Sequence, residues 1–283
     1  MPGCGSLWRS IAAVERYYDS TAEEEDRRLF KDAYHMLEFI VCMHYITKYL
    51  PEKARVLDVG CGSGVYAVEL MKAGCSIALV DLSLKLLKLA RSKVRRLKLA
   101  GRELCVAKGS STNLMFRSSC FDAVLCFGPM YHLIHEVHRD MTAREIHRVL
   151  KHGGVAFISG ISLFGVYGEV VKRWPERLLD ESHREMFEKG VHRAEWYEPG
   201  SAIFTDAYFW KPLELKEYME SFGFETLELA ACEGIVTHLD EQVNAISRDR
   251  EKWSKLLELV MRTSNDPSIV GYTEHFIWVG RKL

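Results

Sequence analysis

The sequence of 283 residues predicts an α/β protein with a doubly wound, mostly parallel sheet of seven strands. Two observations indicate this fold: short apolar runs alternate with helical stretches between residues 55 and 160, and glycines follow the first run directly. This alternation is typical of parallel strands joined by right-handed helical crossovers. The expected strands are Val56–Val59, Ser76–Val80, Leu104–Ala107, Phe121–Phe127, Val155–Ser159, Glu225–Ala231 and His275–Gly280.

Helices are expected before, between and after these strands. An acidic first turn and apolar residues at helical spacing predict one helix from Glu23 to Leu50, inside an N-terminal helical segment. Ser83 has the side chain of an N-cap and should begin a helix that runs to Ala100. The other expected helices are Val65–Lys72, Arg139–Leu150, Pro212–Phe222 and Leu239–Met261.

Residues 161–212 interrupt the alternation of strands and helices. This segment is rich in phenylalanine, tyrosine and tryptophan and has no clear strand. We interpret it as a helical or irregular cap, inserted after the fifth strand.

Composition excludes some classes of protein. A formal net charge of -1 gives no basic footprint for nucleic acid. No apolar run approaches the ~20 residues of a membrane-spanning helix, and the N-terminal residues lack the apolar stretch of a signal peptide. The sequence therefore predicts a cytoplasmic protein with no membrane or nucleic-acid partner, as a monomer or homodimer.

Two further compositional features concern stability. Gln242 is the one glutamine and there are three asparagines, against 38 basic and 39 acidic residues, which indicates a thermophilic source. Eight cysteines occur without a Cys-x-x-Cys pair, so zinc-site and thioredoxin-like spacings are absent. Buried inert thiols and one or two structural disulfides both remain open.

The glycine-rich turn after the first strand reads Asp58-Val-Gly60-Cys-Gly62-Ser-Gly64. A dinucleotide fingerprint has its third glycine one residue later, and no Gly-Lys-Ser/Thr of a P-loop follows. A carboxylate at Asp58 would repel a pyrophosphate, whereas it suits the α-ammonium group of a methionine moiety. The turn therefore favours an adenosyl amino-acid ligand over a dinucleotide.

Asp81 ends the second expected strand, 17 residues past Gly64. A carboxylate in this place can accept hydrogen bonds from both ribose hydroxyls of an adenosine. The alternative role, an N-cap for the next helix, already belongs to Ser83. Asp81 is therefore a candidate ribose ligand.

Four later segments occur in order: Gly109–Leu114, Phe121–Phe127, Gly128-Pro-Met-Tyr-His-Leu133 and Glu145–Gly154. With these motifs, residues 50 to 160 resemble the class I S-adenosylmethionine-dependent methyltransferases, which have a Rossmann-like fold. The Gly-Pro-x-Tyr-His-Leu loop and Phe204–Phe209 resemble a branch that methylates small molecules. The resemblance implies S-adenosylmethionine as cofactor and S-adenosylhomocysteine as product.

The resemblance also implies roles for individual residues. Asp58, Gly60, Gly62 and Gly64 would hold the methionine portion of the cofactor, and Asp81 with Leu82 the ribose. Ser110 and Ser111 would flank the adenine, with Ser110 in the place of the usual aspartate. The other candidate cofactor contacts are Tyr18, Cys61, Phe127 and Gly128.

Methyl transfer from a sulfonium is an in-line displacement, which mainly requires alignment and exclusion of water. A base is needed only where the acceptor must lose a proton. His132 is either that base or a hydrogen-bonded wall of the pocket. Tyr131 is the second catalytic candidate, through a cation–π contact with the sulfonium.

A three-residue spacing of His132, His135 and His138 raises the question of a metal site. No second ligand cluster accompanies it, so we expect no metal and interpret the last two as solvent-facing.

The leading hypothesis is a methyltransferase that acts on a small molecule. We expect the chain to have four parts: an N-terminal lid (1–50), a cofactor-binding core (51–160), the cap (161–212) and the rest of the core (213–283). Gly128 stands where enzymes that methylate nucleic-acid bases have Asn or Asp, which disfavours an RNA methyltransferase without removing it. A non-catalytic module that binds an adenosyl ligand is the other alternative. A nicotinamide dehydrogenase is excluded because Tyr49 and Lys53 precede the first strand.

Overall fold

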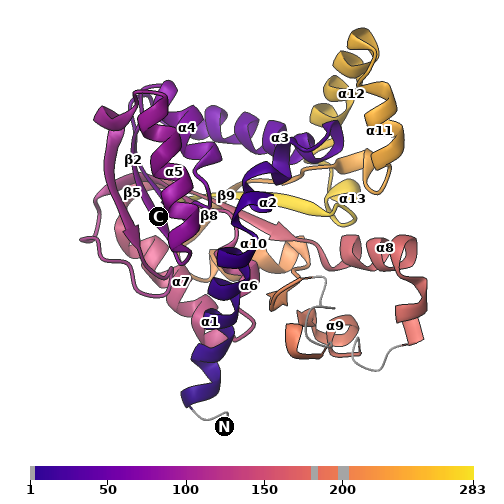
Figure 1. Cartoon of the computed structure of the whole chain (residues 1–283), viewed down its shortest axis with the longest axis horizontal. Helices are drawn as coiled ribbons and strands as arrows, with labels where there is room; N and C mark the ends of the chain where they lie inside the picture. Colours follow the sequence, from indigo (N-terminus) through magenta and orange to yellow (C-terminus); the bar gives the residue numbers. More distant parts are fainter. Residues whose placement is uncertain (1–3, 180–183, 197–203) are drawn as a thin grey trace.

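The computed structural model describes residues 4–179, 184–196 and 204–283. Its centre is a seven-stranded sheet in the order β3-β2-β1-β4-β5-β9-β8 (Figure 1). The first five strands in the chain are parallel, and β9 is antiparallel to both β5 and β8. The predicted mostly parallel sheet of seven strands is confirmed. Its strands are β1 (Arg55–Val59), β2 (Ser76–Asp81), β3 (Glu103–Lys108), β4 (Phe121–Cys126), β5 (Leu150–Ile161), β8 (Phe224–Ala231) and β9 (His275–Lys282).

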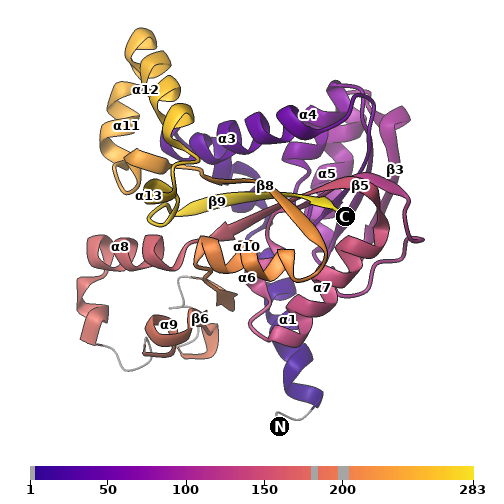
Figure 2. The same ribbon diagram turned by 180° about the vertical axis from the view of Figure 1, so that it is seen from behind.

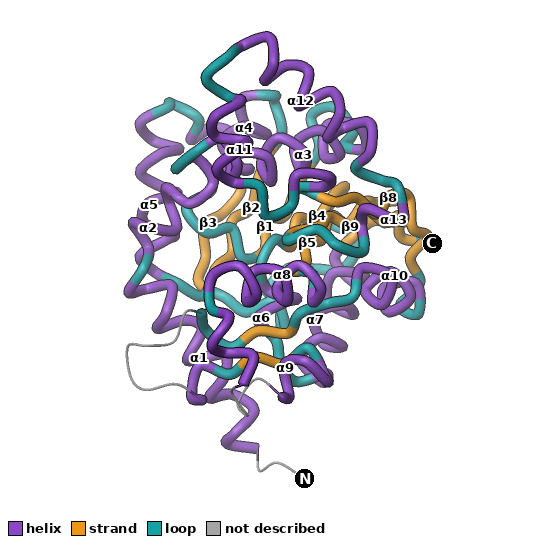
Figure 3. Tube along the Cα trace, turned by 90° about the vertical axis from the view of Figure 1, so that its right-hand side faces the viewer, coloured by secondary structure: helices purple, strands orange, loops and turns teal. Residues whose placement is uncertain are grey.

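Helices cover both faces of this sheet, which lies between two helical layers in Figure 3. One layer contains α3 (Ala33–Tyr49), α4 (Val65–Lys72), α5 (Leu84–Arg96), α11 (Asp240–Ile246) and α12 (Arg250–Thr263). The opposite layer contains α6 (Pro129–His132), α7 (Glu136–Val149) and α10 (Pro212–Glu220). The short helix α13 (Pro267–Val270) precedes β9.

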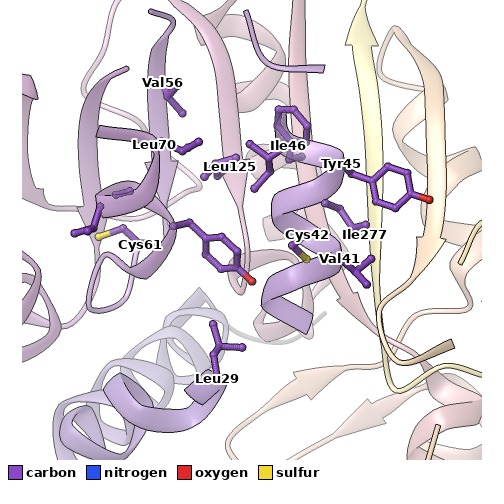
Figure 4. Packing of buried hydrophobic residues seen from close by; sticks show 14 of the residues in the cluster. Leu29, Val41, Cys42, Tyr45, Ile46, Val56, Cys61, Leu70, Leu125 and Ile277 are labelled. Carbon is purple, nitrogen blue, oxygen red and sulfur yellow. The ribbon is translucent and has the colours of Figure 1, made fainter. Parts of the chain in front are cut away.

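Alternating strand residues supply two separate cores. Val56 and Leu125 face the layer of α3, whose Val41 and Ile46 are fully buried there (Figure 4). Their neighbours in the strands, such as Leu57, face the layer of α7. A parallel sheet buried on both faces explains why its strands read as continuous apolar runs.

Two helices expected from the sequence are divided in the structure. The stretch 23–50 contains α2 (Ala22–Arg27), the 3-10 helix η1 (Arg28–Phe30) and then α3. Asp32 begins α3 by accepting a hydrogen bond from the backbone N–H of His35. In the same way Asp249 begins α12, which separates it from α11. Both aspartates are N-caps that apolar periodicity alone overlooked.

The helix α5 begins where the sequence predicts. Its N-cap Ser83 accepts a hydrogen bond from the backbone N–H of Leu86. Leu86, Leu87, Ala90 and Val94 are buried, and most of its lysines and arginines are exposed. The helix ends at Arg96 rather than Ala100.

Residues between β5 and α10 form a small unit of their own. Figure 2 shows it around the labels α8, α9 and β6. It contains α8 (Leu163–Arg173), η3 (Pro175–Leu179), α9 (Arg184–Lys189), η5 (Ala194–Trp196) and a two-stranded sheet of β6 (Val191–His192) and β7 (Ala207–Tyr208). The expectation of no strand here was wrong, because two-residue strands are too short for a periodic pattern. Residues 180–183 and 197–203 lie outside the described part of the chain.

The N-terminal helix α1 (Cys4–Ser20) packs against α5. Within the described ranges, no helix is both long and apolar enough to cross a membrane.

Candidate active site

The glycine turn lies where β1 ends, next to the point at which the strand order reverses between β1 and β4. Such switch points are the usual ligand sites of doubly wound sheets. Gly60, Gly62 and Gly64 all have left-handed backbone conformations, with φ of 69°, 54° and 76°. A side chain at Gly60 would also collide with the ring of Pro129, 2.6 Å from its Cδ atom. The turn therefore requires glycine at this position for two reasons.

A cavity opens over this turn, and we call it the glycine-loop cavity. Its walls come from the ends of β1, β2, β3 and β4 together with α1 and α2. The lining residues are Ile11, Val14, Tyr18, Glu25, Val59, Gly60, Gly62, Asp81, Leu82, Leu86, Gly109, Ser110, Ser111, Gly128, Pro129, His132 and Leu133. Eight of the twelve candidate cofactor contacts from the sequence are among them: Tyr18, Gly60, Gly62, Asp81, Leu82, Ser110, Ser111 and Gly128.

Asp81 is held rigidly at the edge of this cavity. One carboxylate oxygen accepts a hydrogen bond from the backbone N–H of Gly62 and the other from that of Ser83, both at 2.8 Å. Burial raises the pKa of Asp81 to about 6, although these two hydrogen bonds act in the opposite direction.

The other four candidates, Asp58, Cys61, Gly64 and Phe127, do not line the cavity. Asp58 lies in β1 and is only 3% exposed. Burial, with a smaller contribution from the charge of Asp81, raises its pKa to about 8. Two buried carboxyl groups with raised pKa values therefore flank the glycine turn, an arrangement that favours a cationic ligand group.

The two serines after β3 are already partnered. The hydroxyl of Ser110 lies 2.8 Å from that of Thr112, and the hydroxyl of Ser111 lies 2.9 Å from that of Thr142. These contacts fix the loop that forms one wall of the cavity.

A second cavity of about 240 Å³, the aromatic cavity, adjoins the first. Its lining combines aromatic and aliphatic side chains with several charged ones. The lining residues are Tyr18, Glu25, Arg28, Tyr131, Ile161, Val166, Glu169, Val170, Trp174, Arg177, Met186, His192, Phe204, Phe209 and His275. Tyr18 and Glu25 line both cavities, so the two spaces meet at these side chains.

Several of these residues were not found from the sequence. Glu25 and Arg28 were assigned to an unbroken helix, and His275 to a strand. They reach the cavity because α2, η1 and the start of β9 come together in the folded chain, which local patterns do not report.

The candidate base His132 is buried, with 4% of its surface exposed. Its Nε2 atom lies 2.7 Å from the hydroxyl of Tyr18, and its Nδ1 atom lies 3.0 Å from the carbonyl oxygen of Asp206. Burial lowers its pKa to about 4, so the ring is neutral at physiological pH. Tyr131 packs against it, with ring centroids 4.6 Å apart.

His135 and His138, the other two histidines of the three-residue spacing, do not line the glycine-loop cavity with His132. His135 is the N-cap residue of α7 and is partly exposed. His138 is only 2% exposed, so its assignment to solvent was wrong; its ring lies 4.8 Å from that of Trp8. The ring of Trp8 packs over it because α1 covers this part of α7.

A charged network underlies the aromatic cavity. Arg28 donates hydrogen bonds to both carboxylate oxygens of Glu38, at 2.7 and 3.3 Å. His275 pairs with Glu233 at 2.8 Å, and His238 with Glu274 at 2.8 Å. Two sets in the described residues bring three possible metal ligands within 4.8 Å of one another: Glu169, His238 and Glu274, and Glu233, Glu274 and His275. The histidine of each set is already ion-paired, and the absence of a metal stays a prediction.

The sequence is similar to those of known methyltransferases. The family model of a methyltransferase domain matches residues 56–154, from β1 to the start of β5. A ubiquinone biosynthesis O-methyltransferase from an Azoarcus species is 28% identical over 204 residues, which are 70% of this chain and 74% of that protein. A tRNA (carboxymethyluridine(34)-5-O)-methyltransferase from Arabidopsis thaliana is 29% identical over 146 residues, which are 52% of this chain but 32% of that protein.

The fold also has counterparts among solved structures. A SAM-dependent methyltransferase from Methanosarcina mazei superposes with a TM-score of 0.59 at 19% identity, covering 84% of this chain and 97% of that one. The fold, the glycine turn and the matched domain define an enzyme of the methyltransferase class. The matched domain and the methyltransferase relatives make this chain an enzyme that transfers methyl groups from S-adenosylmethionine.

Proposed function

We propose that the protein transfers the methyl group of S-adenosylmethionine, bound in the glycine-loop cavity, to a small molecule bound in the aromatic cavity. One observation carries this proposal: the two cavities meet at Tyr18 and Glu25. An in-line displacement needs the methyl donor and the acceptor atom to be held next to each other, which requires adjoining binding spaces.

On the donor side, Asp81 and Leu82 would hold the ribose, and Ser110 and Ser111 would flank the adenine. The glycine turn would take the methionine portion, with Asp58 neutralising its α-ammonium. The raised pKa values of Asp58 and Asp81 support this assignment, because a cationic ligand group would stabilise the charged form of each buried carboxyl group.

On the acceptor side, residues 161–212 would act as the cap and residues 1–50 as a lid. Trp174, Phe204 and Phe209 from the cap line the aromatic cavity, and α1 and α2 contribute Tyr18 and Glu25. Aromatic walls with a few polar groups are typical of sites for partly apolar small molecules.

The test uses S-adenosylmethionine labelled in its methyl group and a cell extract separated into low-molecular-mass and RNA fractions. We expect label to enter the low-molecular-mass fraction, and an Asp81→Ala variant to transfer at least about tenfold less because it lacks the ribose ligand. Calorimetric titration of the same two proteins with S-adenosylmethionine, S-adenosylhomocysteine and NAD would establish that the loss is one of cofactor binding.

Label in the RNA fraction alone would contradict the small-molecule proposal. It would instead favour an RNA methyltransferase, for which the exposed basic face of α5 and the tRNA-modifying relative are the supporting observations. Binding of S-adenosylmethionine without transfer to either fraction would favour a non-catalytic module.

A further inference from the structure

Tyr18 occupies a particular place in the site. It comes from α1, and its side chain lines both the glycine-loop cavity and the aromatic cavity. His132, the candidate base, lines only the first of these. A molecule in the aromatic cavity therefore meets the phenol of Tyr18 and not the imidazole of His132.

The hydrogen bonds of His132 fix the direction in which a proton can move. The carbonyl oxygen of Asp206 can only accept, so Nδ1 of His132 carries the proton that it receives. The neutral ring then offers Nε2 as an acceptor, and the hydroxyl of Tyr18 donates to it at 2.7 Å. Both ring nitrogens are occupied, so an acceptor molecule has no direct access to either.

We propose that Tyr18 is a catalytic residue that takes the proton of the methyl acceptor while passing its own proton to His132, and that the acceptor is an aromatic hydroxyl compound. This inference rests on the proposed function, since it requires donor and acceptor to meet at Tyr18.

The transfer balances in atoms and charge. The acceptor oxygen forms a bond to the methyl carbon as the carbon–sulfur bond breaks, and the electron pair of that bond stays on sulfur. The acceptor proton passes to the Tyr18 oxygen, and the Tyr18 proton passes to Nε2 of His132. One positive charge leaves the sulfonium and one appears on the imidazolium, which later releases its proton to water.

The electrostatics of the site suit this exchange of charge. Burial lowers the pKa of His132 to about 4 and raises that of Tyr18 well above its usual value, so both groups start neutral. The charged groups that act on the pair are Arg28 from η1, Glu25 from α2 and Asp206 just before β7. The phenol of Tyr131 from α6 lies beside it. Loss of the sulfonium charge during transfer makes the imidazolium easier to form at that moment.

The aromatic cavity determines the class of acceptor. Its walls include Trp174, Phe204 and Phe209, which suit a flat ring. A phenol or naphthol keeps its proton at neutral pH and needs a group to take it, whereas an aromatic thiol is largely ionised without help. The relay therefore favours hydroxyl over thiol acceptors.

The test compares 2-naphthol with naphthalene-2-thiol, two probes of nearly the same shape, at saturating S-adenosylmethionine. Tyr18→Phe should lower kcat for the naphthol about 100-fold and for the thiol by no more than about threefold, with KM for both little changed. The control Tyr17→Phe removes the neighbouring hydroxyl on the same helix and should change neither rate. In Tyr18→Phe the residual naphthol rate should rise with pH, because the naphthol must then ionise by itself.

Should Tyr18→Phe fail to give a cooperative melting transition, His132→Gln replaces it and should show the same selective loss with the naphthol. An equal loss for both probes would overturn the proposal and leave Tyr18 a structural residue. Methylation of neither probe by a protein that binds S-adenosylmethionine in calorimetry would also overturn it. Absence of that binding would instead contradict the proposed function itself.

Discussion

The carboxylate of Asp81 accepts a hydrogen bond at 2.8 Å from the backbone N–H of Gly62. This bond joins the end of β2 to the glycine turn after β1 and leaves the charge of Asp81 close enough to raise the pKa of Asp58. Among the described residues, no basic side chain is a main contributor to the pKa of either buried carboxyl group.

We expect binding of S-adenosylmethionine at pH 7 to release up to one proton from Asp58. The pKa of Asp58 is about 8 in the free protein, so the group is mostly protonated, and a nearby α-ammonium would lower that pKa. Calorimetric titration in buffers of different ionisation enthalpy measures the number of protons released.

The matched control ligand is 5′-methylthioadenosine, which has the adenosine portion and no amino-acid portion. It should bind without this proton release, and Asp58→Asn should abolish the release with S-adenosylmethionine. Equal proton release by the two ligands would show that Asp58 does not face the methionine portion.

Much of the donor side follows from local sequence. The glycines, Asp81 and Ser83 each mark a strand end or a helix start, and strand ends on one edge of a parallel sheet must lie together. For this reason eight of the twelve candidate contacts line one cavity. Asp58 and Cys61 do not line it, because both side chains are buried, Asp58 within β1 and Cys61 in the turn that follows.

The acceptor side could not be predicted in the same way. Its residues come from η1, α8, β9 and the strand β6, which are far apart in sequence and meet only after folding. The bond between Tyr18 and His132 spans 114 positions, and no periodic pattern reports such a contact. The start of a new helix at an N-cap such as Asp32 was likewise not predicted, because the apolar periodicity continues across it.

Substitution at Gly60 should destabilise the protein more than the same change at Gly62. Both have left-handed backbones, so Gly60→Ala and Gly62→Ala should each cost about 1–2 kcal/mol in backbone strain. Only the new Cβ at residue 60 would also overlap the ring of Pro129, whereas nothing lies within 4 Å at residue 62. Denaturant unfolding of both variants measures the difference.

Adding Pro129→Ala to Gly60→Ala should restore the part of the free energy of unfolding that is lost through the overlap with the proline ring. Equal free energies of unfolding for the two single variants would show that the proline ring moves aside at no cost.

Glu38→Gln should lower the free energy of unfolding by about 2–3 kcal/mol at pH 7, since it breaks a pair that is mostly withdrawn from water. Burial alone would raise the pKa of Glu38, but Arg28 and His275 lower it to about 2. A carboxylate with a depressed pKa contributes stability above its unfolded value of about 4.3 and loses it as the pH falls toward 2.

The difference between wild type and Glu38→Gln should therefore shrink below about pH 4, when measured by denaturant unfolding at a series of pH values. Glu258→Gln, on the exposed face of α12, is the matched control and should leave stability unchanged at every pH. A difference that stays constant down to pH 2 would mean that the Glu38 charge plays no part.

Stability should also fall at alkaline pH because of His275. Burial lowers the pKa of His275, but Glu38 and Glu233 raise it to a net value of about 10. A histidine with a raised pKa contributes its full stability below its unfolded value of about 6.5 and loses it as the pH rises through the folded value. The wild-type melting temperature should therefore decline between about pH 7 and pH 10 as this contribution is lost.

The variant His275→Asn isolates this effect. It should be destabilised by about 3 kcal/mol at pH 6.5, where Glu233 loses its cationic partner, and the deficit relative to wild type should narrow toward pH 10. The exposed His44 on α3 provides the control, since His44→Asn should match wild type throughout. A deficit for His275→Asn that is independent of pH would show that the ring acts by packing alone, because only an ion pair can be lost by deprotonation.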